Sequence, residues 1–198
     1  SGGNSAITVG ASGNTTLAGT ANNLGTSTAG TFTSGVTFPA GHVINTYCVA
    51  KLDVQTFTDE LLRADITGLL IEDITPKNSS SKFLVRFDVT YWGHDIAMNI
   101  ERKIASGSYA IIQPPTGLSG SRWPSHSGGG HRGIYDMNSA SMTLLDAPAT
   151  ASDVHYKITL NNCPATGPDG YINRASTMGT GANDEQGVST ITVQEIAG

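Results

Sequence analysis

The chain has 198 residues and a formal net charge of −5 at pH 7, and 38% of its residues are hydrophobic, so one domain of ordinary size with an appendage is expected. The Lys and Arg residues are few and scattered, which gives no basic surface for a phosphate backbone, so no nucleic-acid partner is expected. No apolar run approaches the ~20 residues of a membrane-spanning helix, so membrane insertion is not expected either.

Charge divides the chain into two parts. Residues 1–37 consist mainly of Gly, Thr, Ser, Ala and Asn, and no Asp, Glu, Lys or Arg precedes Lys51. Such a segment buries too little apolar surface to order itself. It is interpreted either as a flexible linker or as the end of a β-structured fibrous shaft whose core forms between chains. A packed domain is expected over residues 38–198.

The first elements of that domain differ in pattern. Residues 43–54 are apolar at nearly every step, which predicts a strand covered on both faces, by a core and by a neighbour, with Cys48 as a small buried hydrophobe. The stretch "FTDELLRAD", residues 57–65, offers the one candidate helix, and it is short. Residues 66–74 are predicted as a strand.

Two strictly alternating segments follow. Residues 82–92 place Phe83, Val85 and Phe87 on one face and charged residues on the other, the pattern of a half-buried strand. Residues 96–104 repeat it after the turn "GHD". The two segments are predicted to form an antiparallel hairpin.

Further strands are expected at "SYAII", "SMTLLD", "VHYKITL", "GYINR" and "VSTITVQEI", which makes about nine in all. This count with Pro and turn residues between segments predicts an all-β, antiparallel two-sheet sandwich. The residues expected to line its core are Phe83, Val85, Phe87, Val89, Ile96, Met98, Ile100, Val154, Tyr156, Ile158, Ile191 and Val193.

The acidic residues do not predict a catalytic site. Glycan hydrolysis needs two carboxylates held ~5–10 Å apart across a cleft. The paired acids here are adjacent in sequence, so on a strand they point to opposite faces. No nucleophile elbow or phosphate-binding loop is present. No catalytic residue and no cofactor is therefore predicted; the acid pairs considered are Asp59–Glu60, Glu72–Asp73 and Asp184–Glu185.

Metal and disulfide sites are not expected. His126 and His131 flank "SGGG" in a polar loop, and a metal site needs more ligands on firmer supports, unless a trimer axis brings three copies of one His together. Cys48 and Cys163 are too few for a disulfide framework and form no close-spaced metal pattern.

The connection over residues 113–136 is longer than an ordinary loop, which suggests a function or disorder. It gathers aromatic rings and directed hydrogen-bond donors, which suit a sugar ring with one apolar face and a rim of hydroxyls. Alternatively, its Trp and Tyr pin the loop to its own domain. The candidate receptor-binding residues are Trp123, His126, His131, Arg132 and Tyr135.

Five segments carry a family resemblance: "TFPAGHVI", "ITGLLIEDITPKNSSSKFLV", "SMTLLDAPATASDVHYKITL", "GYINRAS" and the ending "STITVQEIAG". In that order and spacing they resemble the C-terminal domains of bacteriophage tail fibres and related virion appendages of the marine phage type. The resemblance covers residues 38–198 and is least in 108–135. It implies a jelly-roll-like β-sandwich that forms a homotrimer, caps a fibre of the virion and touches the host surface.

The expected function is therefore a structural virion protein, a trimeric tail-fibre tip that contacts other virion proteins and binds a host surface glycan or receptor. An enzyme is not expected. Two alternatives remain open, a tailspike depolymerase that cuts the glycan it binds and a capsid-mounted fibre or decoration protein.

Overall fold

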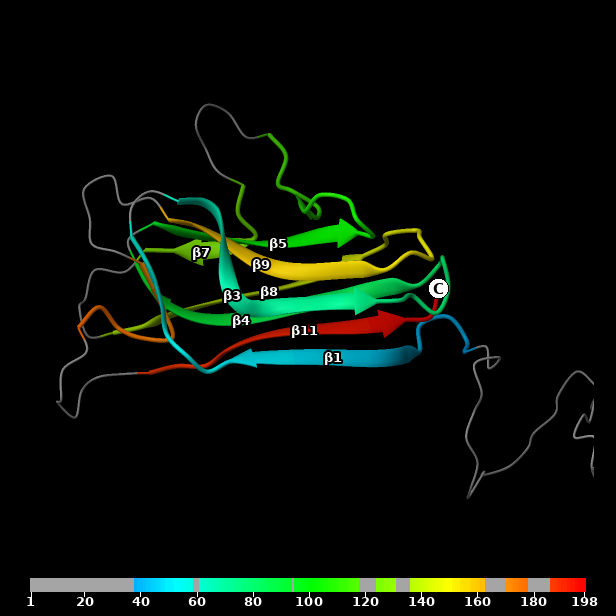
Figure 1. The fold of residues 1–198 in the computed structure, drawn as a ribbon, viewed down its shortest axis with the longest axis horizontal. Helices are drawn as coiled ribbons and strands as arrows, with labels where there is room; N and C mark the ends of the chain where they lie inside the picture. Colours follow the sequence, from blue (N-terminus) through cyan, green and yellow to red (C-terminus); the bar gives the residue numbers. More distant parts are fainter. Residues whose placement is uncertain are drawn as a thin grey trace, which may run out of the picture. The chain divides into compact units, whose positions relative to one another are not determined.

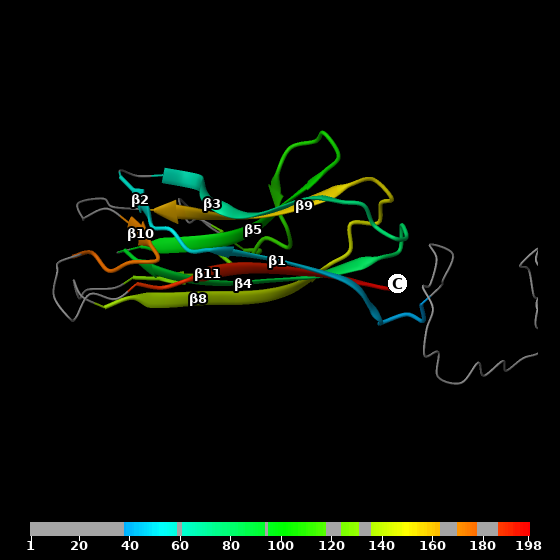
Figure 2. The ribbon, with the colours of Figure 1, turned by 60° about the horizontal axis from the view of Figure 1, so that its bottom comes forward.

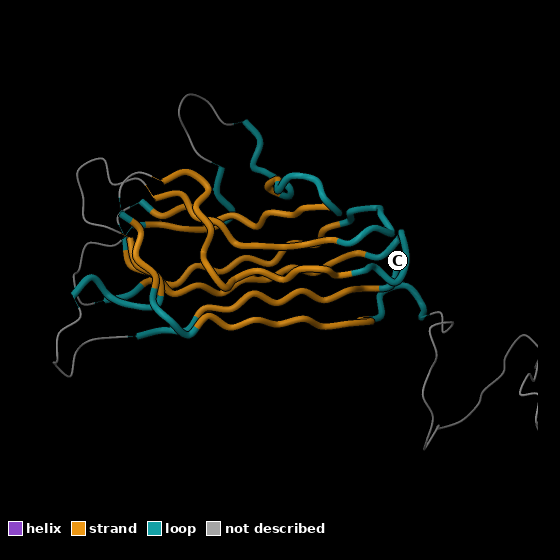
Figure 3. Tube along the Cα trace, in the orientation of Figure 1, coloured by secondary structure: helices purple, strands orange, loops and turns teal. Residues whose placement is uncertain are grey.

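A computed structural model describes residues 38–58, 61–93, 95–117, 124–130, 136–162, 170–177 and 186–198, all within the compact unit Phe38–Gly198. These ranges contain eleven strands and no helix (Figure 3). Within them, accordingly, no helix has the length and hydropathy to cross a membrane. Some of the predictions concern residues outside the described ranges: residues 1–37, Cys163 and the acid pairs Asp59–Glu60 and Asp184–Glu185.

The strands form two antiparallel sheets that pack face to face (Figures 1 and 2). Sheet A has the order β1 (Val43–Lys51), β11 (Ser189–Ile196), β4 (Lys82–Trp92) and β8 (Asn138–Asp146), with β10 (Gly170–Ile172) pairing the end of β4 and β2 (Gln55–Phe57) pairing β10. Sheet B has the order β3 (Leu61–Ile74), β9 (Val154–Asn162) and β5 (Ile96–Ile104), with β6 (Ala110–Ile111) and β7 (Ser127–Gly129) both on the free edge of β5.

The strand order is that of a jelly roll. If β6 and β7 are counted as one interrupted strand, the main strands in chain order are β1, β3, β4, β5, β6/β7, β8, β9 and β11. Sheet A then contains the first, eighth, third and sixth of them, and sheet B the second, seventh, fourth and fifth. This double Greek-key arrangement confirms the predicted jelly-roll-like sandwich.

The core lies between the sheets and contains every residue predicted for it. The least buried member of that set, Ile96, is 3% exposed. The alternation of apolar and polar residues explains why the core was predicted correctly. Successive side chains of a strand point to opposite faces, and only one face of each sheet meets the other sheet. Phe83 of sheet A and Tyr156 of sheet B pack ring against ring across the interface, with centroids 5.8 Å apart.

The predicted hairpin of residues 82–92 and 96–104 is wrong. β4 belongs to sheet A, where it pairs with β8 and β11, and β5 belongs to sheet B, where it pairs with β9. The chain crosses between sheets at Gly93, where a Cβ would lie only 2.7 Å from the side chain of Ile96. Alternation identifies the buried face of each strand, but strands facing each other across a core show the same pattern as strands paired side by side.

The predicted helix over residues 57–65 is also wrong. Residues 57 and 61–65 are in strands, and β3 runs for 14 residues from Leu61. A helix this short is marginal by itself, and pairing with β9 supplies backbone hydrogen bonds that local propensity cannot match. β3 pairs irregularly, and the register shifts between Asp65 and Leu70. Ile66 and Leu69, inside that shift, are buried in the core.

β1 is covered on one face only within the described part of the chain. It is an edge strand that pairs with β11, and Tyr47 and Val49 pack against the core. Cys48 and Ala50 on its other face are exposed, so Cys48 is not the buried hydrophobe expected. The apolar composition predicted two covered faces, whereas in a sandwich of two sheets only the face toward the other sheet is covered.

The sandwich has two distinct ends. At the base end, Gly41 N donates to Ala197 O at 2.8 Å, which places the first described residues beside the C-terminus (Figure 1). At the opposite, far end, Ile96 pairs with both Asn162 and Gly129. β2 and β7, the two strands that the sequence did not predict, both lie toward this end.

Candidate functional site

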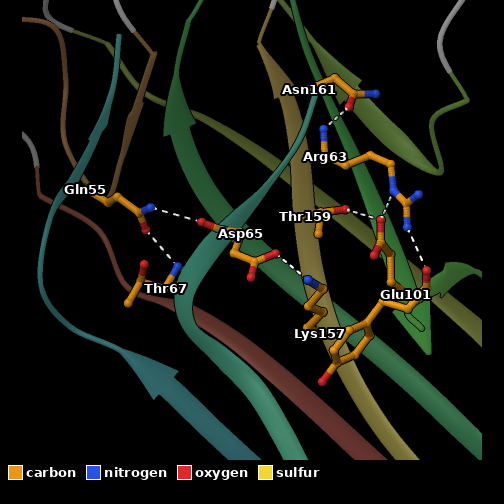
Figure 4. A network of polar contacts seen from close by, with 9 residues as sticks. Gln55, Arg63, Asp65, Thr67, Glu101, Lys157, Thr159 and Asn161 are labelled. Atoms are coloured by element: carbon orange, nitrogen blue, oxygen red, sulfur yellow. Dashed lines mark hydrogen bonds and ion pairs between the residues drawn. The ribbon is translucent and has the colours of Figure 1, made fainter. Parts of the chain in front are cut away.

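A buried polar network lies on the outer surface of sheet B (Figure 4). Along β9, Tyr156, Ile158 and Leu160 point into the core, so Thr159 and Asn161 point outward, yet they are only 0% and 2% exposed. Glu101 on β5 points the same way and is 1% exposed. Polar side chains buried on an outer face must find partners within the fold, because an unpaired buried polar group is costly.

Arg63 supplies the central partner of this network. Its Nε donates to Glu101 Oε1 at 2.5 Å, and Thr159 Oγ1 donates to the same oxygen at 3.1 Å. Arg63 Nη2 donates to Tyr109 O at 3.0 Å, and its backbone N donates to Asn161 Oδ1 at 2.7 Å. The hydrogen bond with Glu101 raises the pKa of Arg63 above its usual range, so the guanidinium stays charged. The network thus joins β3, β5, β9 and the segment before β6.

A second ion pair stands beside the first. Lys157 Nζ donates to Asp65 Oδ1 at 2.5 Å and lies 4.2 Å from the centre of the Tyr109 ring. Burial, and then the nearby carboxylates, raise the pKa of Tyr109 above its usual range. Gln55 spans the irregular part of β3, because its Nε2 donates to Asp65 O at 3.0 Å and its Oε1 accepts from Thr67 N at 2.9 Å. These contacts brace β3 where its register shifts.

The buried carboxylates are committed to structural partners. Besides Glu101, Asp146 accepts from Arg102 and from Tyr156, and Glu195 accepts from Ser81 Oγ at 2.7 Å. These carboxylate oxygens accept hydrogen bonds from within the fold, so they serve its packing and not a substrate. The exposed pair Glu72–Asp73 lies toward the base end, where Asp73 N donates to His155 Nδ1 at 3.2 Å.

Three of the hollows in the described part of the chain each have one carboxylate among their described lining residues. One of about 170 Å³ adjoins Asp65 beside the network, and one of about 340 Å³ adjoins Asp88 on the outer face of sheet A. The third, of about 350 Å³, adjoins Asp95 at the far end of sheet B. The described lining of these three hollows does not include the two opposed carboxylates of a glycosidase. Across the described ranges, no group of three or more His, Cys, Asp and Glu residues is placed to hold a metal ion.

His126 is the one predicted receptor-binding residue that the structure describes, and it braces the fold. Its Nδ1 accepts from Ile100 N at 3.0 Å, its Nε2 donates to Ile112 O at 2.8 Å, and its backbone N donates to Met98 O at 2.9 Å. Both ring nitrogens are therefore occupied by backbone groups, one on β5 and one just after β6. The other four candidates, Trp123, His131, Arg132 and Tyr135, lie outside the described residues.

Acidification is expected to weaken this brace. Burial lowers the pKa of His126 below its usual value of about 6.5, so between that lowered pKa and about 6.5 the unfolded chain binds more protons than the folded chain. The free energy of unfolding should therefore fall as the pH falls through this window. Urea unfolding between about pH 7 and pH 5 measures the slope. A His126→Gln variant, which keeps a donor and an acceptor without titrating, should show a shallower slope; an identical slope would contradict the assignment.

Sequence reasoning missed the hollow at the far end, whose lining comes from Asp95–Ala97, Ser125 and Ser127–Gly130. The signal available was the run "SGGG" between two predicted binding residues, because consecutive glycines in a strand mark close approach of a backbone or a ligand. Two segments distant in sequence form this hollow. Only the pairing of β5 with β7 brings them together.

Comparison with known proteins adds little to this description. No family model matches the chain, and no curated protein matches it. Among solved structures, it is similar to a chain of the structure of infectious bursal disease virus, Gx strain, with 9% sequence identity and a TM-score of 0.38. The match covers 78% of this chain and 33% of that chain, so this chain spans about a third of the other's length. The fold assignment rests on the strand order of the two sheets.

Proposed function

We propose that residues 38–198 form the head of a homotrimeric virion appendage, a tail-fibre tip, which attaches to glycan on the host surface. In this proposal residues 1–37 connect the head to the rest of the fibre and so to other virion proteins. The jelly roll is compatible with this role, although many functions share the fold. The resemblance of five segments to tail-fibre domains points in the same direction.

The separation of the two ends of the sandwich carries the proposal. Gly41, which follows the junction with residues 1–37, hydrogen-bonds to Ala197 at the base end. The strands that flank residues 131–135 end at the far end, where Gly129 pairs with Ile96 and Asn138 pairs with Tyr91. A head held at its base presents its far end to the host, and its connections are free to carry binding chemistry because the strands are committed to the sheets.

The open face of β1 supports the homotrimer. Residues 43–54 are apolar enough for a strand covered twice, yet Cys48 and Ala50 are exposed and Val43 is 51% exposed. A neighbouring copy of the chain is the covering that the sequence pattern predicts.

Glycan cleavage is the weaker interpretation, because the described hollows hold single carboxylates. Immunogold labelling of virions distinguishes a tail fibre from a capsid-mounted fibre.

Replacing Trp123, His131 and Arg132 together with alanine is expected to reduce adsorption of the isolated protein to host cells by at least ~100-fold. Each lost contact weakens one site, and the three copies of a trimer multiply the loss. Adsorption of labelled protein is the measurement. Light scattering should give the mass of three 20.5 kDa chains for parent and variant alike.

The matched control replaces Phe38, His42 and Lys82 with alanine. These residues offer the same three chemical types at the base end, and their loss should leave adsorption unchanged. The proposal fails if the loop variant competes with virus for host cells as well as the parent does. A parent with the mass of a single chain would rule out the trimer.

A further inference from the structure

We propose that the far end of sheet B carries a subsite for one neutral sugar unit of the host glycan, in the hollow between Asp95 and β7. This inference rests on the proposed function and names the ligand class and the residues of its site. The hollow measures about 350 Å³ and is lined by Asp95, Ile96, Ala97, Ser125, Ser127 and Gly128–Gly130. Small-molecule sites typically measure ~300–1,000 Å³.

Asp95 supplies the hydrogen-bond acceptors. It is exposed, and its carboxylate has no hydrogen bond or ion pair with the described residues, in contrast to Glu101 and Asp146, whose oxygens are occupied. A carboxylate accepts two hydrogen bonds side by side, which matches neighbouring hydroxyls on a sugar ring. Among the described residues that line the hollow there is no Lys, Arg or His, so the charge that this lining presents to a ligand is that of Asp95. A neutral sugar is the ligand that this charge favours.

The floor of the hollow lacks long side chains. Gly128 pairs with Ala97, so these two residues present a hydrogen and a methyl group to the same face. The fold itself requires glycine at position 128, because a Cβ there would collide with the carbonyl oxygen of Ile96. At Gly129, which pairs with the core residue Ile96, a Cβ would lie 3.4 Å from Oη of the buried Tyr91, so this glycine faces the core side of the sheet. The backbone that the floor leaves accessible to a ligand is that of Gly128, which is exposed.

The open edge of β7 supplies further polar groups. Within the described part of the chain β7 pairs only with β5, so its other edge presents backbone N–H and C=O groups. Ser125 also lines the hollow; its Oγ donates to Ser127 O at 2.7 Å, and the same Oγ can accept a hydrogen bond from a ligand. A peptide strand is a poorer occupant of this edge, because β7 has only three residues and offers no side-chain pockets for an incoming strand. Scattered donors and acceptors around a small floor suit a polyhydroxylated ring.

Two variants test the subsite by different routes. Asp95→Ala removes the acceptor, and Ala97→Leu fills the floor. Each should reduce binding of the full chain to a printed array of neutral bacterial surface polysaccharides by at least ~10-fold, since a hydrogen bond to a charged group is lost or the ring is excluded. Free neutral monosaccharides at high millimolar concentration should compete with the parent for the array. Glu72→Ala, an exposed carboxylate toward the base end of β3, is the matched control and should bind as the parent does.

The outcomes separate the subsite from the proposed function. If the parent binds glycans and both variants bind equally well, the subsite is refuted and the proposed function stands. If the parent binds no glycan and does not adsorb to host cells, both fail. Loss of parent binding in a chelator, restored by Ca²⁺, would replace the sugar-only subsite with a cation site. A variant that elutes with a different mass from the parent would make the hollow part of a contact between chains instead.

Discussion

Replacing Phe87 with alanine is expected to lower the free energy of unfolding by about 3–5 kcal/mol. Phe87 is 0% exposed, and its strand is paired on both sides, with Ile191 of β11 and Met142 of β8 opposite it. Strands held on both sides cannot close around a deleted ring, so the loss includes a cavity as well as the transfer of the ring to water. Few single changes in the domain remove more buried surface.

Denaturant unfolding at a fixed protein concentration measures this loss, since assembly makes apparent stability depend on concentration. Leu145→Ala on β8 is the matched control. Leu145 is 47% exposed on the outer face of sheet A, so its truncation should cost less than about 0.5 kcal/mol. Equal losses for the two variants would contradict the packing of the core described here.

Replacing Arg102 with methionine is expected to lower the free energy of unfolding by about 3 kcal/mol. Arg102 Nη1 donates to both carboxylate oxygens of Asp146 at 2.7 Å, and Asp146 is 5% exposed. Removing the cation leaves the buried carboxylate with the neutral hydroxyl of Tyr156, which donates to Asp146 Oδ2 at 2.7 Å. Burial raises the pKa of Tyr156 far above its usual range, so that hydroxyl keeps its proton. The Arg102 side chain is 26% exposed, which keeps the expected loss at the lower end for a buried pair.

An exposed ion pair in the same domain provides the comparison. Arg86 Nε donates to Asp88 Oδ2 at 2.7 Å, but the side chains are 59% and 44% exposed. Arg86→Met should therefore cost at most about 1 kcal/mol, because water already solvates both charges. Thermal or denaturant unfolding of both variants measures the two changes. If Arg102→Met lowers the free energy of unfolding no more than Arg86→Met does, Asp146 is not effectively buried.

The candidate site could be predicted from the sequence only in part. The prediction for His126 rested on its place in a long polar loop, but its ring nitrogens bond to Ile100 and Ile112, which are remote in the chain. Asp95 was not predicted as a binding residue, because a single acidic residue in a turn has no distinctive pattern. Its significance arises when β5 and β7 pair and place it beside Ser127 and Gly129. Pairings between distant segments leave little trace in local composition.

The sequence by itself determined the all-β class, nearly all the main strands and the residues of the core, because a period of two fixes which side chains share a face. Only the tertiary structure decided which strands pair. β4 and β5 bury alternate residues alike, yet Gly93 carries the chain from one sheet to the other. Likewise Leu61–Asp65 adopt a strand because β9 pairs with Leu61, Ala64 and Asp65, a long-range gain that no local propensity reports.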